Sequence, residues 1–245
     1  MGRTDEALKW AEKEHQAKLE RALHPSPAAR TKPPRRSWNH LTMEGYVHLK
    51  TNLLTRYPNG SVKTVLFAGT APGDGVSTTA LNFAATLARD PQLKILLIDA
   101  NLRTPSLHMV FKIDRSLGLS DLVVQNGCGT PIAVGPENLH FIPCGRHHNE
   151  PVTVFQSNEF DQFLKVMKES YDYVILDGPP VHGFQECRVL CAKVDGVILV
   201  IESGKTRRQV ALRAKKQLEE AAGKLLGVVL NQRKYYIPEF VYRWL

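Results

Sequence analysis

Short apolar runs alternate with longer amphipathic stretches through most of the chain, from about residue 62 onward. The runs are rich in β-branched residues and hold few polar positions, which is typical of parallel strands buried on both faces. The longer stretches carry apolar residues at helical spacing. Alternating strands and helices favour right-handed crossovers. The pattern therefore predicts an α/β fold with a doubly wound, mostly parallel sheet that helices cover on both faces.

The boundaries of these elements follow from where each pattern stops. Strands are expected at residues 62–68, 95–98, 139–142, 173–176, 197–201 and 226–230. Helices are expected between them at residues 77–89, 119–125, 159–170, 184–192 and 206–222. A further helix is expected to begin near residue 40 and to stop before the turn-forming sequence Pro58-Asn59-Gly60.

The two ends of the chain depart from this alternation. Residues 1–23 predict an N-terminal amphipathic helix, because Ala and Leu recur at helical spacing among charged residues. A loosely ordered helix is the alternative there. Residues 24–39 are rich in Pro and basic residues, a composition typical of a linker. The sheet-containing domain then covers residues 40–232, and residues 233–245 form an aromatic and basic tail.

Charge and composition indicate the cellular compartment and the kinds of partner that are expected. The 245-residue chain carries a formal net charge of +8, and its basic residues gather toward both ends. Such a surface is either simply solvated or docks onto an acidic partner or an anionic membrane surface. Nucleic acid is not expected as a partner, because no helix-turn-helix or RNA-binding signature is present. The charged N-terminus, the lack of an apolar run of about 18 residues and four cysteines without metal-ligand spacing predict a cytoplasmic protein with reduced thiols.

The first candidate site is the loop after the first expected strand, where the sequence reads AGTAPGDGVSTT. Gly73 and Gly75 allow consecutive amides to point at an anion, and the following helix adds its N-terminal partial positive charge. Ser77 stands where a P-loop places its Mg²⁺ ligand. Val76 stands where that pattern has lysine, and Thr70 where it has its first glycine. A tight turn that caps a helix is the alternative interpretation of this loop on its own.

Two aspartates favour the phosphate-site interpretation. Asp99 ends an apolar run in ILLIDANLRTPSLH, and Asp177 ends another in YDYVILDGPPV. One such aspartate is often a helix cap or a turn former. Two of them at strand ends of one parallel sheet lie where ligands bind in this class of fold. A carboxylate pair there can hold a metal ion near the P-loop.

Together, several segments resemble the bacterial tyrosine-kinase (BY-kinase) family of MinD/ParA-type P-loop proteins. They are APGDGVSTT, LLIDANLRTPSLH, GLSDLV, YDYVILDGPP, VDGVILVIESGKT and LLGVVLN, and the resemblance covers roughly residues 40–235. It implies a homo-oligomeric protein that binds Mg-ATP, phosphorylates its own tyrosine-rich C-terminal tail and governs exopolysaccharide length and export. It also implies a membrane polysaccharide co-polymerase (chain-length determinant) as partner, which would hold the chain at the cytoplasmic face of the inner membrane.

The resemblance also assigns roles residue by residue. The nucleotide-binding positions are Gly73, Asp74, Gly75, Val76, Ser77, Thr78 and Asn231, the last of which often contacts adenine in this class. The catalytic positions are Asp99, Asn101, Arg103 and Asp177, and the Mg²⁺ ligands are Ser77, Asp99 and Asp177. The phospho-acceptor candidates are Tyr235, Tyr236 and Tyr242. These tyrosines could instead pack on the domain or on a partner, as amphipathic aromatic residues do.

Departures from the family pattern bear on activity. Val76 replaces the lysine that reaches the β- and γ-phosphates, and such a charge-assisted contact is worth about 1.5–3 kcal/mol. Asn101 replaces the second aspartate of the D-x-D-x-R motif. In the oligomer-contact motif E-x-x-R-x-x-R, which begins at Glu44, Val47 and Lys50 stand at the arginine positions. These changes predict a degenerate enzyme, whose cofactor is Mg-ATP if it has one.

Three functions stay open at this point. The first is a pseudokinase that regulates or scaffolds an exopolysaccharide synthesis complex through protein contacts. The second is an active tyrosine autokinase that uses a displaced cation, for which Lys205 near a strand end is a candidate. The third is a MinD/ParA-like positioning ATPase, which ranks last because DANLRTPSLH and DGPP look less like that branch.

Overall fold

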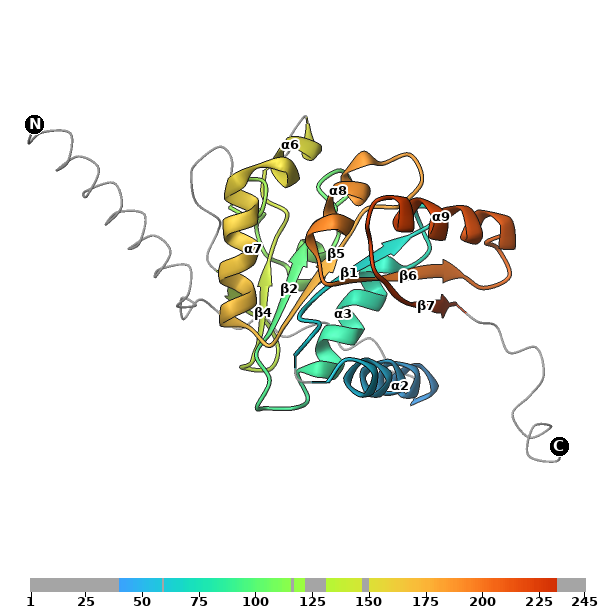
Figure 1. Cartoon of the computed structure of the whole chain (residues 1–245). Coiled ribbons are helices and arrows are strands. Elements are labelled where there is room, and N and C mark those ends of the chain that lie inside the picture. Colours follow the sequence, from blue (N-terminus) through green and yellow to red (C-terminus); the bar gives the residue numbers. More distant parts are fainter. Residues whose placement is uncertain (1–39, 59, 116, 122–130, 147–149, 233–245) are drawn as a thin grey trace, which may run out of the picture.

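A seven-stranded sheet runs through the centre of the molecule (Figure 1), and its strand order is β3-β4-β2-β5-β1-β6-β7. The computed structural model describes residues 40–58, 60–115, 117–121, 131–146 and 150–232. Its strands are β1 Thr64–Gly69, β2 Ile95–Asp99, β3 Ile132–Ala133, β4 Leu139–Ile142, β5 Tyr173–Asp177, β6 Gly196–Glu202 and β7 Leu225–Asn231. Every neighbouring pair is parallel except β3 with β4. The predicted α/β fold with a mostly parallel sheet is confirmed.

Helices cover both faces of this sheet. They are α2 His40–Arg56, α3 Val76–Leu87, α4 Leu107–Phe111, α6 Pro151–Gln156, α7 Asn158–Ser170, α8 Gln185–Lys193 and α9 Arg208–Glu220. Figure 1 shows α2 and α3 on one side and α7, α8 and α9 on the other. Buried residues of α2, α3 and α4 belong to one apolar cluster, and those of α6 to α9 belong to a second.

The central strands are apolar on both faces because they supply both of these clusters. Every residue of β1, β2 and β5 is buried. Leu66 and Leu96 pack on the side of α6 to α9, whereas Phe67 and Leu97 pack on the side of α2 and α3. The ring of Phe67 lies 5.4 Å from the ring of Phe83 on α3. Because alternate residues of a strand point to opposite faces of the sheet, this packing determines the face on which each side chain at a strand end lies.

The sequence pattern does not predict α4, α6 or β3. These elements have 5, 6 and 2 residues, which is too short for a period to be visible. The first strand also begins at Thr64 rather than at residue 62. Its start is set by Asp195, whose Oδ2 accepts the amides of Lys63 and Thr64 at 2.9 Å each. This contact depends on a residue more than a hundred positions away, so local pattern cannot reveal it.

Several predictions lie outside the described residues. They are the N-terminal helix, the linker and the tail (1–23, 24–39 and 233–245), the tyrosines Tyr235, Tyr236 and Tyr242, and most of the helix expected at 119–125. These stay predictions. Within the described part of the chain, no helix is long and apolar enough to cross a membrane.

Candidate nucleotide site

The loop between β1 and α3 lies at the edge of the sheet where the carboxyl ends of the parallel strands meet. Gly73 and Gly75 take left-handed backbone conformations there, with φ of 94° and 83°. Gly75 is the N-cap residue of α3, and no side chain caps the helix at this point. The first amides of a helix have no acceptor within the helix. The amides of Val76, Ser77 and Thr78 are therefore available to an anion.

Asp74 braces this loop from inside. Its Oδ2 accepts hydrogen bonds from the amide and the hydroxyl of Thr70, both at 2.7 Å, and from the amide of Ala71 at 3.0 Å. From the opposite side, Nδ2 of Asn231 on β7 donates to the carbonyl of Asp74 at 2.9 Å. A Cβ on Gly75 would lie only 2.0 Å from that Nδ2, so glycine is required by close approach as well as by φ. Contacts on both sides thus hold the loop in one shape.

Val76 brings no cation to the loop. Its side chain is half-buried and packs against the apolar cluster on the side of α2 and α3. Its Cγ2 lies 2.8 Å from the position that a Cβ on Gly69 would occupy, so the isopropyl group points back toward the end of β1. An anion in this loop would meet backbone amides, without the charged side chain that a P-loop adds at this position.

Asp99 and Asp177 lie side by side at the ends of β2 and β5. They are partners in the register of the two strands, and both are fully buried. Oδ1 of Asp99 accepts the amide of Asn101 at 3.3 Å, and Oδ2 accepts the amide of Leu107 at 3.2 Å. Neither carboxylate oxygen of Asp177 has a hydrogen-bond partner among the described residues. Two buried carboxyl groups are therefore adjacent, and one of them lacks any donor.

Burial raises the pKa of both carboxyl groups. Desolvation raises the pKa of Asp99 from 3.8 to about 7, although the amides of Leu107 and Asn101 oppose it. The pKa of Asp177 lies well above its ordinary value because of desolvation and the charge of Asp99. The Ser77 hydroxyl is close enough to oppose this second rise, without completing a hydrogen bond of normal geometry. Near neutral pH the pair retains a proton unless a cation neutralises it.

The same three side chains suit Mg²⁺. The Ser77 hydroxyl and the carboxylates of Asp99 and Asp177 are hard oxygen ligands, which this cation prefers. The unpartnered oxygens of Asp177 point to such an occupant, because buried polar atoms without a partner are rare in native proteins. When bound, the cation would neutralise the pair and polarise the phosphate oxygens of a nucleotide. The structure thus brings together the residues that the sequence suggests as Mg²⁺ ligands.

Comparison with known proteins identifies the family to which this chain belongs. The AAA-domain family model (AAA_31) matches residues 62–221. The tyrosine-protein kinase YwqD of Bacillus subtilis is 32% identical over 196 residues, which cover 79% of this chain and 82% of that protein. The chain belongs to the bacterial tyrosine-kinase family.

Solved structures agree with this membership in the BY-kinase family. The crystal structure of the chimerical protein CapA2B2 matches with a TM-score of 0.75 and 25% identity, over 82% of this chain and 88% of that chain. The septum site-determining protein MinD of Pyrococcus horikoshii OT3, complexed with Mg-ADP, matches with a TM-score of 0.58 and 20% identity, over 74% of this chain and 76% of that chain. The second likeness shows the fold alone. The predicted MinD/ParA-like P-loop fold is confirmed.

The side chains at two BY-kinase motif positions have hydrogen-bond partners outside the aspartate pair. Oδ1 of Asn101 accepts the amide and the hydroxyl of Thr104, each at 3.2 Å. Arg103 donates from Nε to the buried carboxylate of Glu186 on α8, and its guanidinium lies 5.8 Å from the ring centroid of Phe184. Asn101 therefore fixes its own turn, and Arg103 ties the segment after β2 to α8. Their catalytic roles, like the contact of Asn231 with adenine, stay predictions.

Two cations near the site, Arg115 and Lys205, have no role among the nucleotide-binding and catalytic positions that the family resemblance assigns. Arg115 is half-buried, and its charge is among the influences that lower the pKa of Asp99. Lys205 follows β6, which lies beside β1 in the sheet, and its Nζ donates to Oε2 of Glu202 at 2.8 Å. The pKa of Lys205 is raised by this bond to Glu202, by the charge of Glu202 and by that of Asp74. The sequence offers no signal for Arg115, whereas Lys205 lies in the family-like segment VDGVILVIESGKT after an expected strand.

Proposed function

We propose that this chain is a BY-kinase-like regulator or scaffold of exopolysaccharide or capsule biosynthesis and export, with weak or lost ATP binding and kinase activity. Family membership supports the setting, because the BY-kinase resemblance implies a membrane chain-length determinant as partner. That partner would hold the chain at the cytoplasmic face of the inner membrane. One observation carries the loss of activity: the half-buried isopropyl group of Val76 packs against the core at the position of the family's phosphate-binding lysine.

The charges around the loop support the same conclusion. Asp74, Asp99 and Asp177 are buried there, and a triphosphate would add further negative charge. Of the nearby cations, Arg103 is paired with Glu186 and Lys205 with Glu202, and the charge of Arg115 already acts on Asp99. Because Mg²⁺ offsets only part of this negative charge, a nucleotide at this loop lacks the stabilisation that the missing ammonium gives.

The absence of the lysine would lower the rate of phosphoryl transfer more than it lowers the affinity for nucleotide. Phosphoryl transfer depends almost wholly on positioning and on electrostatic stabilisation of the charge that develops on the phosphoryl oxygens. Val76 contributes nothing to that stabilisation. Asn101 stands where the family has a second carboxylate, and its amide oxygen is occupied by Thr104. Two polar groups are therefore missing from the chemistry of one site.

Measurement of ADP release and of tyrosine phosphate on the purified full-length protein tests this proposal. With Mg-ATP, the native protein is expected to show no more of either product than Asp177→Asn, which lacks one of the proposed Mg²⁺ ligands. ADP release accompanied by phosphotyrosine, with both abolished in Asp177→Asn, would establish an active kinase instead.

An active autokinase with a displaced cation is the second candidate, and the position of Lys205 favours it. The charge of Asp74 in the loop contributes to the raised pKa of Lys205, so the two groups interact electrostatically. If Lys205 served the phosphates, Lys205→Met would weaken Mg-ATP binding roughly tenfold. Our proposal predicts instead that the affinity stays the same.

Lys215→Met is the matched control, because Lys215 is a half-exposed lysine of α9 that pairs with Glu219 at 3.4 Å. Calorimetric titration of both variants with Mg-ATP decides between the candidates. Equal Mg-ATP affinities support the regulator or scaffold, whereas a loss of affinity confined to Lys205→Met supports the active autokinase.

A further inference from the structure

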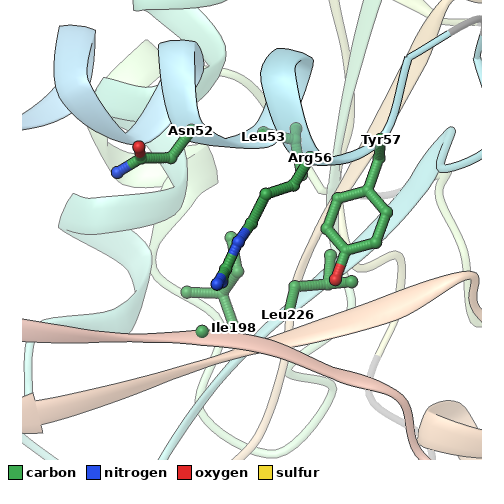
Figure 2. Close-up of a pocket in the computed structure, with 7 residues that line it drawn as sticks. Asn52, Leu53, Arg56, Tyr57, Ile198 and Leu226 are labelled. Atoms are coloured by element: carbon green, nitrogen blue, oxygen red, sulfur yellow. The ribbon is translucent and has the colours of Figure 1, made fainter.

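A cavity of about 390 Å³ lies between α2 and the strands β6 and β7 (Figure 2). It is lined by Asn52, Leu53, Arg56, Tyr57, Ile198, Leu226 and Gly227. The lining residues of β6 and β7 belong to the first three positions of each strand, whereas the nucleotide loop contacts the last residue of β7. The cavity is therefore separate from the nucleotide site.

Gly227 creates much of this space. In the register of β6 and β7 it is the partner of Ile198, whose side chain belongs to the cluster on the side of α2 and α3. A side chain at position 227 would point to that same face. A Cβ placed there meets no atom within 4 Å, and the φ of Gly227 is not in the left-handed region. Since neither the backbone nor a close contact requires glycine, its effect here is to leave volume open beneath α2.

The cavity has an apolar floor and a cationic rim. Ile198 and Leu226 are buried and form the floor. Figure 2 shows the Arg56 side chain extending from α2 toward the strands, with the Tyr57 hydroxyl directed toward Leu226. Nζ of Lys224 lies 4.6 Å from the centroid of the Tyr57 ring and adds a second positive charge.

The residues that line the cavity carry no negative charge. None of the lining residues is acidic, and Arg56 has no carboxylate partner among the described residues. Arg56 is exposed, so its guanidinium is accessible to an anion that enters the cavity. The planar guanidinium matches a carboxylate or phosphate group, to which it can donate two parallel hydrogen bonds.

We propose that this cavity binds a small organic anion, with its carboxylate or phosphate group at Arg56 and its apolar body on Ile198 and Leu226. The volume is within the range of about 300–1,000 Å³ that is usual for small-molecule sites. The Tyr57 hydroxyl and the Asn52 amide offer further hydrogen bonds to the anionic group. This site is independent of whether nucleotide binds at the P-loop.

Four probes titrated into the full-length protein, followed by backbone amide NMR, test the ligand class. Phenyl phosphate and benzoate combine an anionic group with a ring, inorganic phosphate has only the charge, and benzyl alcohol has only the ring. At least one of the first two is expected to shift the amide signals of Gly227 and Ile198. Inorganic phosphate and benzyl alcohol are expected to bind at least roughly tenfold more weakly, because each lacks one half of the recognition. The stronger of the first two identifies the carboxylate or the phosphate as the natural group.

Two variants test the location. Gly227→Val fills the cavity and is expected to abolish binding, and Arg56→Gln is expected to weaken it roughly tenfold. Lys216→Gln, on the exposed side of α9, is the control and should bind as the native protein does. If Gly227→Val fails to fold, Arg56→Gln decides alone. Arg56→Gln that binds as tightly as the native protein, inorganic phosphate that binds as tightly as phenyl phosphate, or no binding by any probe would overturn the proposal.

Discussion

Val76→Lys is expected to bind Mg-ATP roughly ten- to a hundredfold more tightly than the native protein, because it restores a charge-assisted contact worth about 1.5–3 kcal/mol. The rest of the phosphate-binding loop between β1 and α3 is already in place. Gly75 caps α3 without a side-chain competitor, and Asp74 with Asn231 holds the loop in shape. The lysine stem can follow the path of the Val76 side chain along the core before its ammonium reaches the phosphates. Isothermal titration calorimetry with Mg-ATP and Mg-ADP measures the gain.

Val76→Met is the control for this gain, since it adds a long side chain without charge. It should bind no more tightly than the native protein, and thermal unfolding of both variants checks that the core still packs. Equal improvement in the two variants would attribute the gain to side-chain length. Failure of Val76→Lys to gain affinity, in a folded protein, would show that the loop lacks more than its lysine.

Asp177→Asn should become progressively more stable than the native protein as the pH rises from about 4 to about 7, in the absence of divalent cations. The folded-state pKa values of Asp99 and Asp177 are raised, so the folded protein binds protons more tightly than the unfolded chain. Their contribution to stability is therefore fully present below about pH 4. The part from Asp99 is lost as the pH rises through about 7, and the part from Asp177 is lost as that carboxyl group ionises. Removing one carboxyl group removes much of that loss.

The difference in unfolding free energy between Asp177→Asn and the native protein should grow across that pH range, because the native protein loses stability as Asp177 ionises and the variant does not. Denaturant unfolding at several pH values measures it. Taking the change with pH, rather than one absolute value, cancels the packing cost of the amide.

The carboxylate pair also predicts that Mg²⁺ affects the stability of the native protein and of Asp177→Asn differently. Mg²⁺ should stabilise the native protein at about pH 8 and should have little effect on Asp177→Asn, which has lost the unpartnered carboxylate. Asp161→Asn, at a half-exposed position on α7, should respond as the native protein does. A pH-independent difference between native and Asp177→Asn, or equal stabilisation of both by Mg²⁺, would contradict the carboxylate pair as a cation site.

Sequence alone could predict the sheet and the meeting of Asp99 with Asp177. Each aspartate ends an apolar run, and parallel strands buried on both faces bring such ends to one edge. The alternation also places Ser77 at the start of a helix beside them. These inferences succeed because they depend on local pattern and on the handedness of crossovers, both of which act within short segments of the chain.

Tertiary contacts explain what the sequence could not predict. Arg103 fits a catalytic motif, and the sequence gives no sign of the ion pair that it forms with Glu186 on α8. Asn231 fits a nucleotide contact, whereas here it donates to the backbone of the loop. The cavity beneath α2 depends on a missing side chain at Gly227 in an edge strand. None of these features has a local periodicity, and each follows from which segments the fold places side by side.

Calorimetric titration of the native protein with Mg-ATP, combined with a measurement of ADP release from the same sample, tests the central claim most directly. With an uncharged side chain at position 76, we expect binding well outside the micromolar range and no turnover above background. Micromolar affinity together with steady ADP release would contradict it.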